Sequence, residues 1–75
     1  MKITLKLIGP LVYAAGFSEK EFELRDPATV EGLIGLIELD QDRPRIVTRN
    51  GRAIAETDAL REGDRVVISP LYSGG

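Results

Sequence analysis

The chain contains no cysteine and no histidine among its 75 residues. Without cysteine it has no disulfide, no thiolate metal site and no cysteine nucleophile, and without histidine it has no imidazole for acid–base catalysis. The acidic cluster of Glu38, Asp40 and Asp42 lacks the spacing of a calcium-binding loop. We therefore expect a solvated acidic surface there and not a metal site.

An excess of charge of one sign and a long hydrophobic run are also missing. Ten Lys and Arg residues stand against 12 Asp and Glu residues, which gives a net charge of −2 at pH 7. That balance argues against an electrostatically driven partnership with nucleic acid. The apolar stretches are short and interrupted, so no segment resembles a signal peptide or a membrane span, and we expect a cytoplasmic protein with no membrane partner.

Two alternating segments at the start of the chain predict a pair of strands. In KITLKLIG (residues 2–9) apolar and polar residues alternate, which is the pattern of a strand with one buried face. Gly9 and Pro10 interrupt it, and after a loop that includes YAAGFS (residues 13–18) the alternation returns in KEFEL (residues 20–24). We expect the two strands to pair as a hairpin with a long loop.

The next segment changes to a helical period. In DPATVEGLIGLIEL (residues 26–39) one helical face is formed by Val30, Leu33, Ile34 and Ile37. Thr29 is a plausible N-cap, and Asp26 before Pro27 is the alternative. Gly32 and Gly35 fall on the opposite face and lower the intrinsic helix propensity, so this one clear helix is expected to depend on packing against a sheet.

A second hairpin and a last strand complete the pattern. Asn50-Gly51 between IVTR and RAI predicts a two-residue type I′ turn, and TDALREGD (residues 57–64) predicts a short turn or 3₁₀ segment that places Leu60 in the core. RVVISP (residues 65–70) is apolar on both faces, which is typical of a central strand. We expect it to lie parallel to the first strand, with Lys2, Lys6 and Arg65 sharing the uncovered face of the sheet.

These elements predict an α+β fold, with a mixed sheet of four or five strands and one helix packed across one face. Residues 1–70 form the predicted domain. Residues 71–75, LYSGG, form a predicted free tail that ends in Gly74 and Gly75. A terminal Gly-Gly pair arises by chance in about 0.5% of chains, so it calls for an explanation.

The order of elements, together with this ending, resembles the MoaD/ThiS family of ubiquitin-like β-grasp sulfur carriers. The resemblance covers essentially the whole chain and rests on LIGPL, ATVEGLIGLI, RNG, LREGDRVVISPL and, most specifically, the terminal GG. LIGPL and Pro70 are more similar to the MoaD branch, which serves molybdopterin synthesis, than to the ThiS branch, which serves thiamine thiazole synthesis.

The resemblance implies that Gly75 carries the chemistry through its α-carboxylate, which is adenylated and then converted to a thiocarboxylate. It implies a ubiquitin-activating-type adenylyltransferase that uses ATP and Mg²⁺, and a sulfur donor that is a sulfurtransferase or a cysteine desulfurase. It also implies the large subunit of molybdopterin synthase, or thiazole synthase, as a partner. The chain itself is then a protein cosubstrate, or the small non-catalytic subunit of that synthase, with no catalytic side chain and no bound cofactor of its own.

Two groups of residues are expected to meet these partners. The activating enzyme recognises the tail residues Leu71, Tyr72, Ser73 and Gly74, since glycines without Cβ atoms pass through a narrow channel. Arg65 and Val67 belong to a partner surface on the uncovered sheet face. Two alternatives remain open: a ubiquitin-like modifier attached to protein lysines through Gly75, and a β-grasp interaction module whose Gly-Gly is incidental. The sulfur acceptor also remains open.

Overall fold

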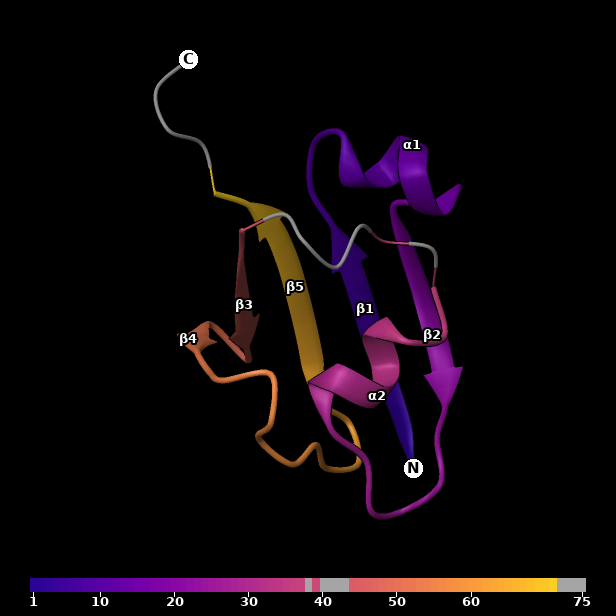
Figure 1. The fold of residues 1–75 in the computed structure, drawn as a ribbon. Helices are drawn as coiled ribbons and strands as arrows, with labels where there is room; N and C mark the ends of the chain where they lie inside the picture. Colours follow the sequence, from indigo (N-terminus) through magenta and orange to yellow (C-terminus); the bar gives the residue numbers. More distant parts are fainter. Residues whose placement is uncertain (38, 40–43, 72–75) are drawn as a thin grey trace.

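The computed structural model describes residues 1–37, 39 and 44–71. In these residues a five-stranded mixed sheet, in the order β2-β1-β5-β3-β4, carries helix α2 across one face (Figure 1). In chain order the elements are β1 (Lys2–Leu7), α1 (Leu11–Ala15), β2 (Glu19–Glu23), α2 (Val30–Ile34), β3 (Arg45–Arg49), β4 (Arg52–Ala53) and β5 (Arg65–Pro70). The predicted α+β fold with a mixed sheet is confirmed.

Strands β1 and β5 form the centre of the sheet. β1 pairs with β2 as the predicted antiparallel hairpin, in which Lys2 lies opposite Glu23 and Lys6 lies opposite Glu19. β5 runs parallel to β1 and antiparallel to β3. The prediction that the last strand is central and parallel to the first is therefore confirmed, and it places the end of β5 at the opposite end of the sheet from Met1.

The core lies between the sheet and α2. The alternating side chains of β1 and β5 that face α2 are buried, as are the apolar side chains of the helix: Ile3, Leu5, Leu7, Val66, Ile68, Val30, Leu33 and Ile34. Each buried side chain of this size stabilises the fold by about 1.5–3 kcal/mol relative to exposure. The other face of the sheet, which we call the open face, carries the alternate residues of the same strands.

Helix α2 begins as predicted and ends earlier than predicted. The Thr29 hydroxyl accepts a hydrogen bond from the Gly32 N–H at 3.1 Å, so Thr29, and not Asp26, is the N-cap. After Gly35 the backbone N–H groups of Leu36 and Ile37 bond three residues back, and the α-helix stops at Ile34. Ile37, the fourth apolar position of the period, therefore lies beyond the helix, where it packs half-buried against the core.

Helix α1 was not predicted from the sequence: the segment between the first two strands was expected to be a loop. Pro10 adopts the αR conformation at the N-cap of α1, with φ −64°. Gly16 ends the helix in the left-handed conformation, with φ 88°, and its N–H donates to the Val12 carbonyl. α1 has no buried residue, and only Leu11, Val12 and Ala15 pack against the core, so its apolar signal is weak.

The Asn50-Gly51 turn is confirmed, and it is tied to the central strand. Asn50 (φ 52°) and Gly51 (φ 87°) both have positive φ, as a type I′ turn requires. The Asn50 side chain accepts from the Arg65 N–H at 2.9 Å and donates to the buried Asp64 carboxylate at 3.1 Å. These bonds fix the β3–β4 hairpin against the start of β5.

The TDALREGD segment places Leu60 in the core, as predicted. The Leu60 side chain is buried, and its N–H donates to the Ala28 carbonyl just before α2. Gly63 has a φ of 84° at the turn into β5. Among the described residues no helix is both long enough and apolar enough to cross a membrane.

Candidate functional site

The predicted site lies at the end of β5, and Leu71 is its last described residue. The expected tail residues Tyr72, Ser73, Gly74 and Gly75 lie outside the described residues, as does the acidic cluster of Glu38, Asp40 and Asp42. The Leu71 N–H donates to the Pro44 carbonyl at 3.2 Å, one step beyond the Arg45–Pro70 pair of the β3–β5 ladder. The base of the predicted tail is therefore bonded to the sheet through Leu71, whose residue surface is 55% exposed.

Arg65 and Val67, the predicted partner-surface residues, both lie on the open face of β5. Arg65 lies opposite Thr4, and Val67 lies between Lys6 of β1 and Thr48 of β3. Because these neighbours alternate with the buried residues of their strands, their side chains point away from α2. This register brings Lys2, Lys6 and Arg65 to the open face, as the sequence predicted.

Arg65 forms an ion pair across the open face. Its Nη2 lies 3.1 Å from the Glu19 Oε1 of strand β2, and the side chains of Arg65 and Glu19 are 48% and 50% exposed. Because both side chains are about half exposed, their charges are accessible to solvent and to a partner, and the ion pair contributes little stability.

Val67 and Leu71 belong to an apolar patch that the sequence reasoning identified only in part. On β3, Ile46 lies opposite Ser69 of β5. At the end of β1 the Ile8 N–H donates to the Ile68 carbonyl, so Ile8 lies beside Ser69 on the side away from β3. Ile8 and Ile46 are 38% and 41% exposed. We call Ile8, Ile46, Val67 and Leu71 the open-face patch.

The sequence contained a signal for the two missed residues. Ile8 continues the alternation of KITLKL on the polar side, and Ile46 is next to the core residue Val47, so it must face the other way. An exposed group of large apolar side chains beside the end of a strand is typical of a protein–protein contact. The open-face patch surrounds the point at which the chain leaves the sheet.

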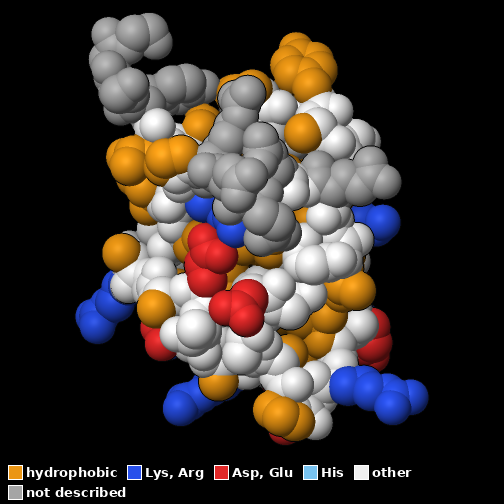
Figure 2. All heavy atoms as spheres, viewed as in Figure 1, with side chains coloured by type: hydrophobic (Ala, Val, Ile, Leu, Met, Phe, Trp, Pro, Cys, Tyr) orange, Lys and Arg blue, Asp and Glu red, His pale blue; other side chains and the backbone are white. Residues whose placement is uncertain are grey.

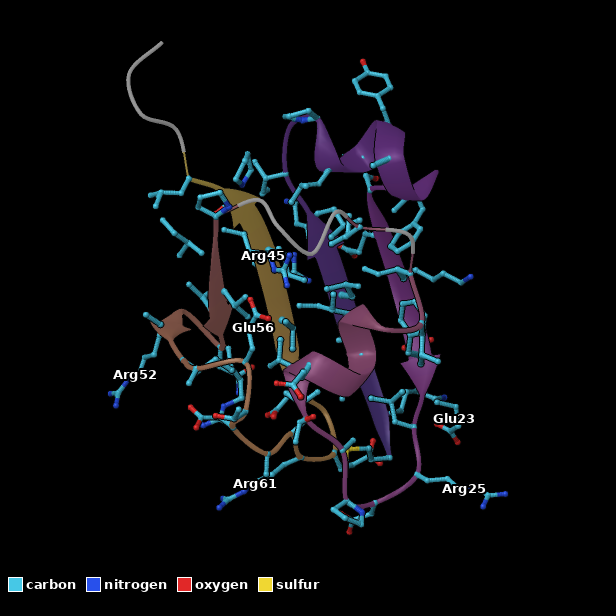
Figure 3. All side chains as sticks on the ribbon, viewed as in Figure 1. Glu23, Arg25, Arg45, Arg52, Glu56 and Arg61 are labelled. Carbon is cyan, nitrogen blue, oxygen red and sulfur yellow. The ribbon has the colours of Figure 1, made fainter. Side chains whose placement is uncertain are left out.

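The helix face carries a bidentate, largely buried ion pair. Nε and Nη2 of Arg45 donate to the two carboxylate oxygens of Glu56, each at 2.9 Å, and the Arg45 side chain is only 8% exposed. The Glu56 carbonyl also accepts the Glu31 N–H at the start of α2. Figure 3 shows Arg45 and Glu56 directed toward each other on this face, whereas Arg25, Arg52 and Arg61 point away from the fold. The pair joins β3, the loop after β4 and α2, and so supports the fold behind the open face.

Other chemistry is sparse in the part of the chain that the structure describes. It contains no group of three or more His, Cys, Asp or Glu side chains arranged to hold a metal ion. A cavity of about 530 Å³ is lined by Met1, Asp26, Ala59, Leu60, Arg61 and Glu62, at the opposite end of the sheet from Leu71. On the helix face, most of the Lys and Arg side chains in view lie at separate points around the outline, and blue side-chain atoms also lie near the centre, beside acidic side chains (Figure 2). The end of β5 therefore remains the candidate functional site.

Comparison with solved structures finds the same fold in proteins of similar size. SAMP1 from Haloferax volcanii is 27% identical with a TM-score of 0.79, and all of both chains is covered. A second crystal structure, of small archaeal modifier protein 1 from H. volcanii, is 25% identical with a TM-score of 0.74, over 92% of this chain and 95% of that one. A putative molybdopterin converting factor, subunit 1, from Pyrococcus furiosus is 27% identical with a TM-score of 0.79, over 93% of this chain and 97% of that one.

Comparison with curated protein sequences gives no match. The model of the ThiS family, in contrast, matches residues 5–75, which is the chain without its first four residues. The match includes β5 and runs through Gly74 and Gly75. With its ubiquitin-like β-grasp fold and this match, the chain belongs to the ThiS family.

Proposed function

We propose that the chain is a sulfur carrier whose C-terminal Gly75 is adenylated and then converted to a thiocarboxylate. The observation that carries the proposal is the family match, which continues past the central strand β5, ending at Pro70, and runs through Gly74 and Gly75. Two structural features support it. Leu71 is bonded to Pro44 at the base of the tail, and the open-face patch surrounds that base.

The reaction needs a partner enzyme because a carboxylate resists nucleophilic attack. An oxygen of the Gly75 carboxylate attacks the α-phosphorus of ATP, pyrophosphate leaves, and the partner's Mg²⁺ balances the phosphate charge. A sulfur nucleophile from the donor protein then attacks the acyl carbon and displaces AMP. This nucleophile is the terminal sulfur of a persulfide, so the product is an acyl disulfide. A second thiol then attacks the donor's sulfur, the S–S bond breaks, the two thiol sulfurs form a disulfide, and the thiocarboxylate sulfur stays on Gly75. No side chain of this chain acts as an acid or a base in these steps.

The geometry of the tail sets how far the reacting carbon reaches. Beyond the Leu71–Pro44 bond, the four residues 72–75 span at most about 14 Å at full extension. A partner must therefore bring its nucleotide within that distance of the sheet edge. The open-face patch provides the contact surface for such an approach, and Arg65 lies at its border.

We assign the carrier to molybdopterin synthesis in the cytoplasm, as the small non-catalytic subunit beside a large synthase subunit. The similarity to the putative molybdopterin converting factor subunit of P. furiosus supports this choice. The partners are then an adenylyltransferase of the ubiquitin-activating type and a sulfurtransferase or cysteine desulfurase. The thiamine thiazole pathway is the alternative, and thiazole synthase is its acceptor.

A second candidate function is a covalent protein modifier. It is favoured by the similarity to small archaeal modifier protein 1 over nearly the whole of both chains. The same Gly75 adenylate serves both functions, because attack by a lysine amine in place of sulfur forms an amide. The nucleophile supplied by the partner then decides the outcome.

The adenylation step can be tested directly. The chain is incubated with a purified adenylyltransferase of this type, Mg²⁺ and ATP, and pyrophosphate release is measured. We expect release that depends on the chain and is lost when Gly75 is deleted. A Gly32→Ala chain, altered on the helix face, serves as the matched control and should support full release. Equal release with and without Gly75 would contradict the proposal.

A further inference from the structure

Within residues 1–37, 39 and 44–71, strand β2 has a free edge, which is independent of the site at the end of β5. It is the outermost strand on its side of the sheet, while the other edge is formed by β4, which spans only Arg52–Ala53. The bonds Leu7 N–H to Ser18 O and Leu24 N–H to Met1 O show which residues of this segment face β1. By alternation Lys20 and Phe22 also face β1, so the N–H and C=O groups of Glu19, Glu21 and Glu23 point outward.

These outward groups form a template for another strand. No described residue donates to or accepts from the backbone of Glu19, Glu21 or Glu23 on the outer side of β2. All three residues are exposed, and the labelled Glu23 side chain extends away from the fold (Figure 3). Unpaired edge groups of this kind bind an added strand through main-chain hydrogen bonds.

The side chains along the edge determine which strand can pair with it. Glu19, Glu21 and Glu23 alternate along β2, so their carboxylates lie in one row on the open face. On the β1 side of this row Lys2 lies opposite Glu23, Lys6 lies opposite Glu19, and Arg65 pairs with Glu19, whereas the outer side has no cation from the described strands. A second copy added antiparallel about a two-fold axis at Glu21 would place Glu19 opposite Glu23 and Glu21 opposite itself. Like charges directly opposite are destabilising, so this row disfavours self-association and favours a basic strand.

The other face of β2 has a different character. Phe17 and Phe22 form a half-buried ring pair with centroids 6.1 Å apart, and the Lys20 amine lies 5.7 Å and 5.4 Å from their centroids. A residue of an added strand on this side lies beside Lys20 and the rings. A cation is disfavoured there by Lys20, whereas an apolar side chain gains contact with the rings.

We propose that the free edge of β2 binds an extended segment of a partner protein in which basic and apolar residues alternate. The basic side chains lie beside Glu19, Glu21 and Glu23 on the open face, and the apolar side chains lie beside Phe22 on the helix face. The backbone of the segment pairs with the outward groups of the three glutamates. This binding uses a surface that the carrier chemistry at Gly75 leaves free, and it does not depend on that chemistry.

The probe is the blocked peptide Arg-Val-Arg-Val-Arg-Val-Arg, added to the isotope-labelled full chain. We expect the peptide to slow hydrogen exchange at the amides of Glu19, Glu21 and Glu23 by about tenfold or more at saturation, because they become donors in a ladder. A peptide of the same composition ordered Arg-Arg-Arg-Arg-Val-Val-Val is the matched control. We expect it to bind more weakly and to leave these amides unprotected.

Two variants separate backbone pairing from charge attraction. Glu21→Pro removes one outward N–H but no hydrogen bond to β1, and proline is tolerated in an edge strand. Because one hydrogen bond and one negative charge are lost together, the affinity for the peptide should fall about tenfold. Glu21→Gln keeps the N–H, so it should weaken binding less and preserve protection at Glu19 and Glu23. Unchanged exchange at the β1 and β5 amides shows that each variant is folded.

Two results would overturn the proposal. Equal binding of the two peptides, without protection of the Glu19, Glu21 and Glu23 amides, would mean simple charge attraction. Protection confined to residues near Val67 and Leu71 would mean that the open-face patch, and not the edge of β2, binds the peptide. If Glu21→Pro does not fold, the exchange measurement on the unaltered chain still decides between these outcomes.

Discussion

At the scale of single residues, Gly32 is a position at which one methyl group strengthens the fold. It lies inside α2, and a Cβ added there meets only the Thr29 Oγ1, at 3.5 Å, which is an ordinary contact. We expect Gly32→Ala to raise the free energy of unfolding by up to about 1 kcal/mol, because alanine has the higher helix propensity. Denaturant melts measure the change.

Gly35 and Gly51 provide comparisons for the stability change at Gly32. Gly35 has a helical φ of −64°, and its added Cβ would lie 3.4 Å from the Gly32 carbonyl, so Gly35→Ala should also stabilise, but by less because Gly35 is at the helix end. Gly51 has a φ of +87° in the hairpin turn. Gly51→Ala should lower the stability by about 1 kcal/mol or more. A loss of stability in Gly32→Ala would mean that the glycine is needed for close packing.

The Arg45–Glu56 and Arg65–Glu19 ion pairs should differ in their contributions to stability. Glu56→Ala removes the bidentate acceptor of the largely buried Arg45 side chain, so we expect a loss of about 1–3 kcal/mol of unfolding free energy. Glu19→Ala removes the exposed partner of Arg65 and should cost less than about 1 kcal/mol. Thermal or denaturant unfolding of both variants provides the comparison. Equal losses would contradict the structural role given to the Arg45–Glu56 pair.

At the scale of elements, local signals in the sequence were sufficient for most of the fold. The alternation of residues 2–7, the Asn50-Gly51 turn and the two-faced apolar pattern of β5 each reflect a local backbone or burial requirement, so they were readable. The sequence missed α1, because its five residues bury no side chain and its start and end depend on Pro10 and Gly16. The end of α2 was misplaced because the change to tighter turns after Gly35 leaves the apolar period intact.

The candidate site could be predicted from the sequence only in part, for a similar reason. Val67 and Leu71 could be predicted from the position of β5 near the end of the chain. The open-face patch also includes Ile8 and Ile46, which lie beside β5 only because β1 and β3 pair with it. The Arg45–Glu56 pair joins residues whose meeting depends on the path of the loop after β4. Neither contact is encoded in local periodicity.

The open-face patch leads to a prediction about element β5. Val67→Asp places a charge at the centre of the patch while the buried residues Val66 and Ile68 are unchanged. We expect the affinity for the adenylating partner to fall about tenfold or more, because a central apolar contact is replaced by a desolvated charge. Isothermal titration measures it, with Arg52→Ala on the distant strand β4 as the control. An unchanged affinity would exclude Val67 from the interface.

Charge at the border of the patch should affect the rate of association. Arg65→Glu breaks the pair with Glu19 and places two like charges near each other on the open face. If Arg65 steers the encounter, the association rate should fall at low salt and approach that of the unaltered chain at high salt. Stopped-flow binding at several ionic strengths shows this. A salt-independent rate in both chains would rule out steering by Arg65.

At the scale of the whole molecule, the length of the tail should matter for chemistry but not for folding. The last residues of a chain usually contribute little to stability, so deleting Gly75 or adding one residue after it should leave the unfolding free energy unchanged. Either change moves the reacting carbon by about the length of a peptide unit, whereas reaction needs an approach of about 3–3.5 Å. Adenylation should therefore be lost in both variants while unfolding curves overlay.

The most direct test of the carrier proposal is the mass of the intact chain after incubation with the adenylyltransferase, ATP, Mg²⁺ and a persulfide-bearing sulfur donor. We predict a gain of about 16 Da, because one carboxylate oxygen of Gly75 is replaced by sulfur. The chain without Gly75 should keep its mass. An unaltered mass for the full chain, or its appearance only in conjugates with other proteins, would contradict the account, and the second result would establish the modifier in its place.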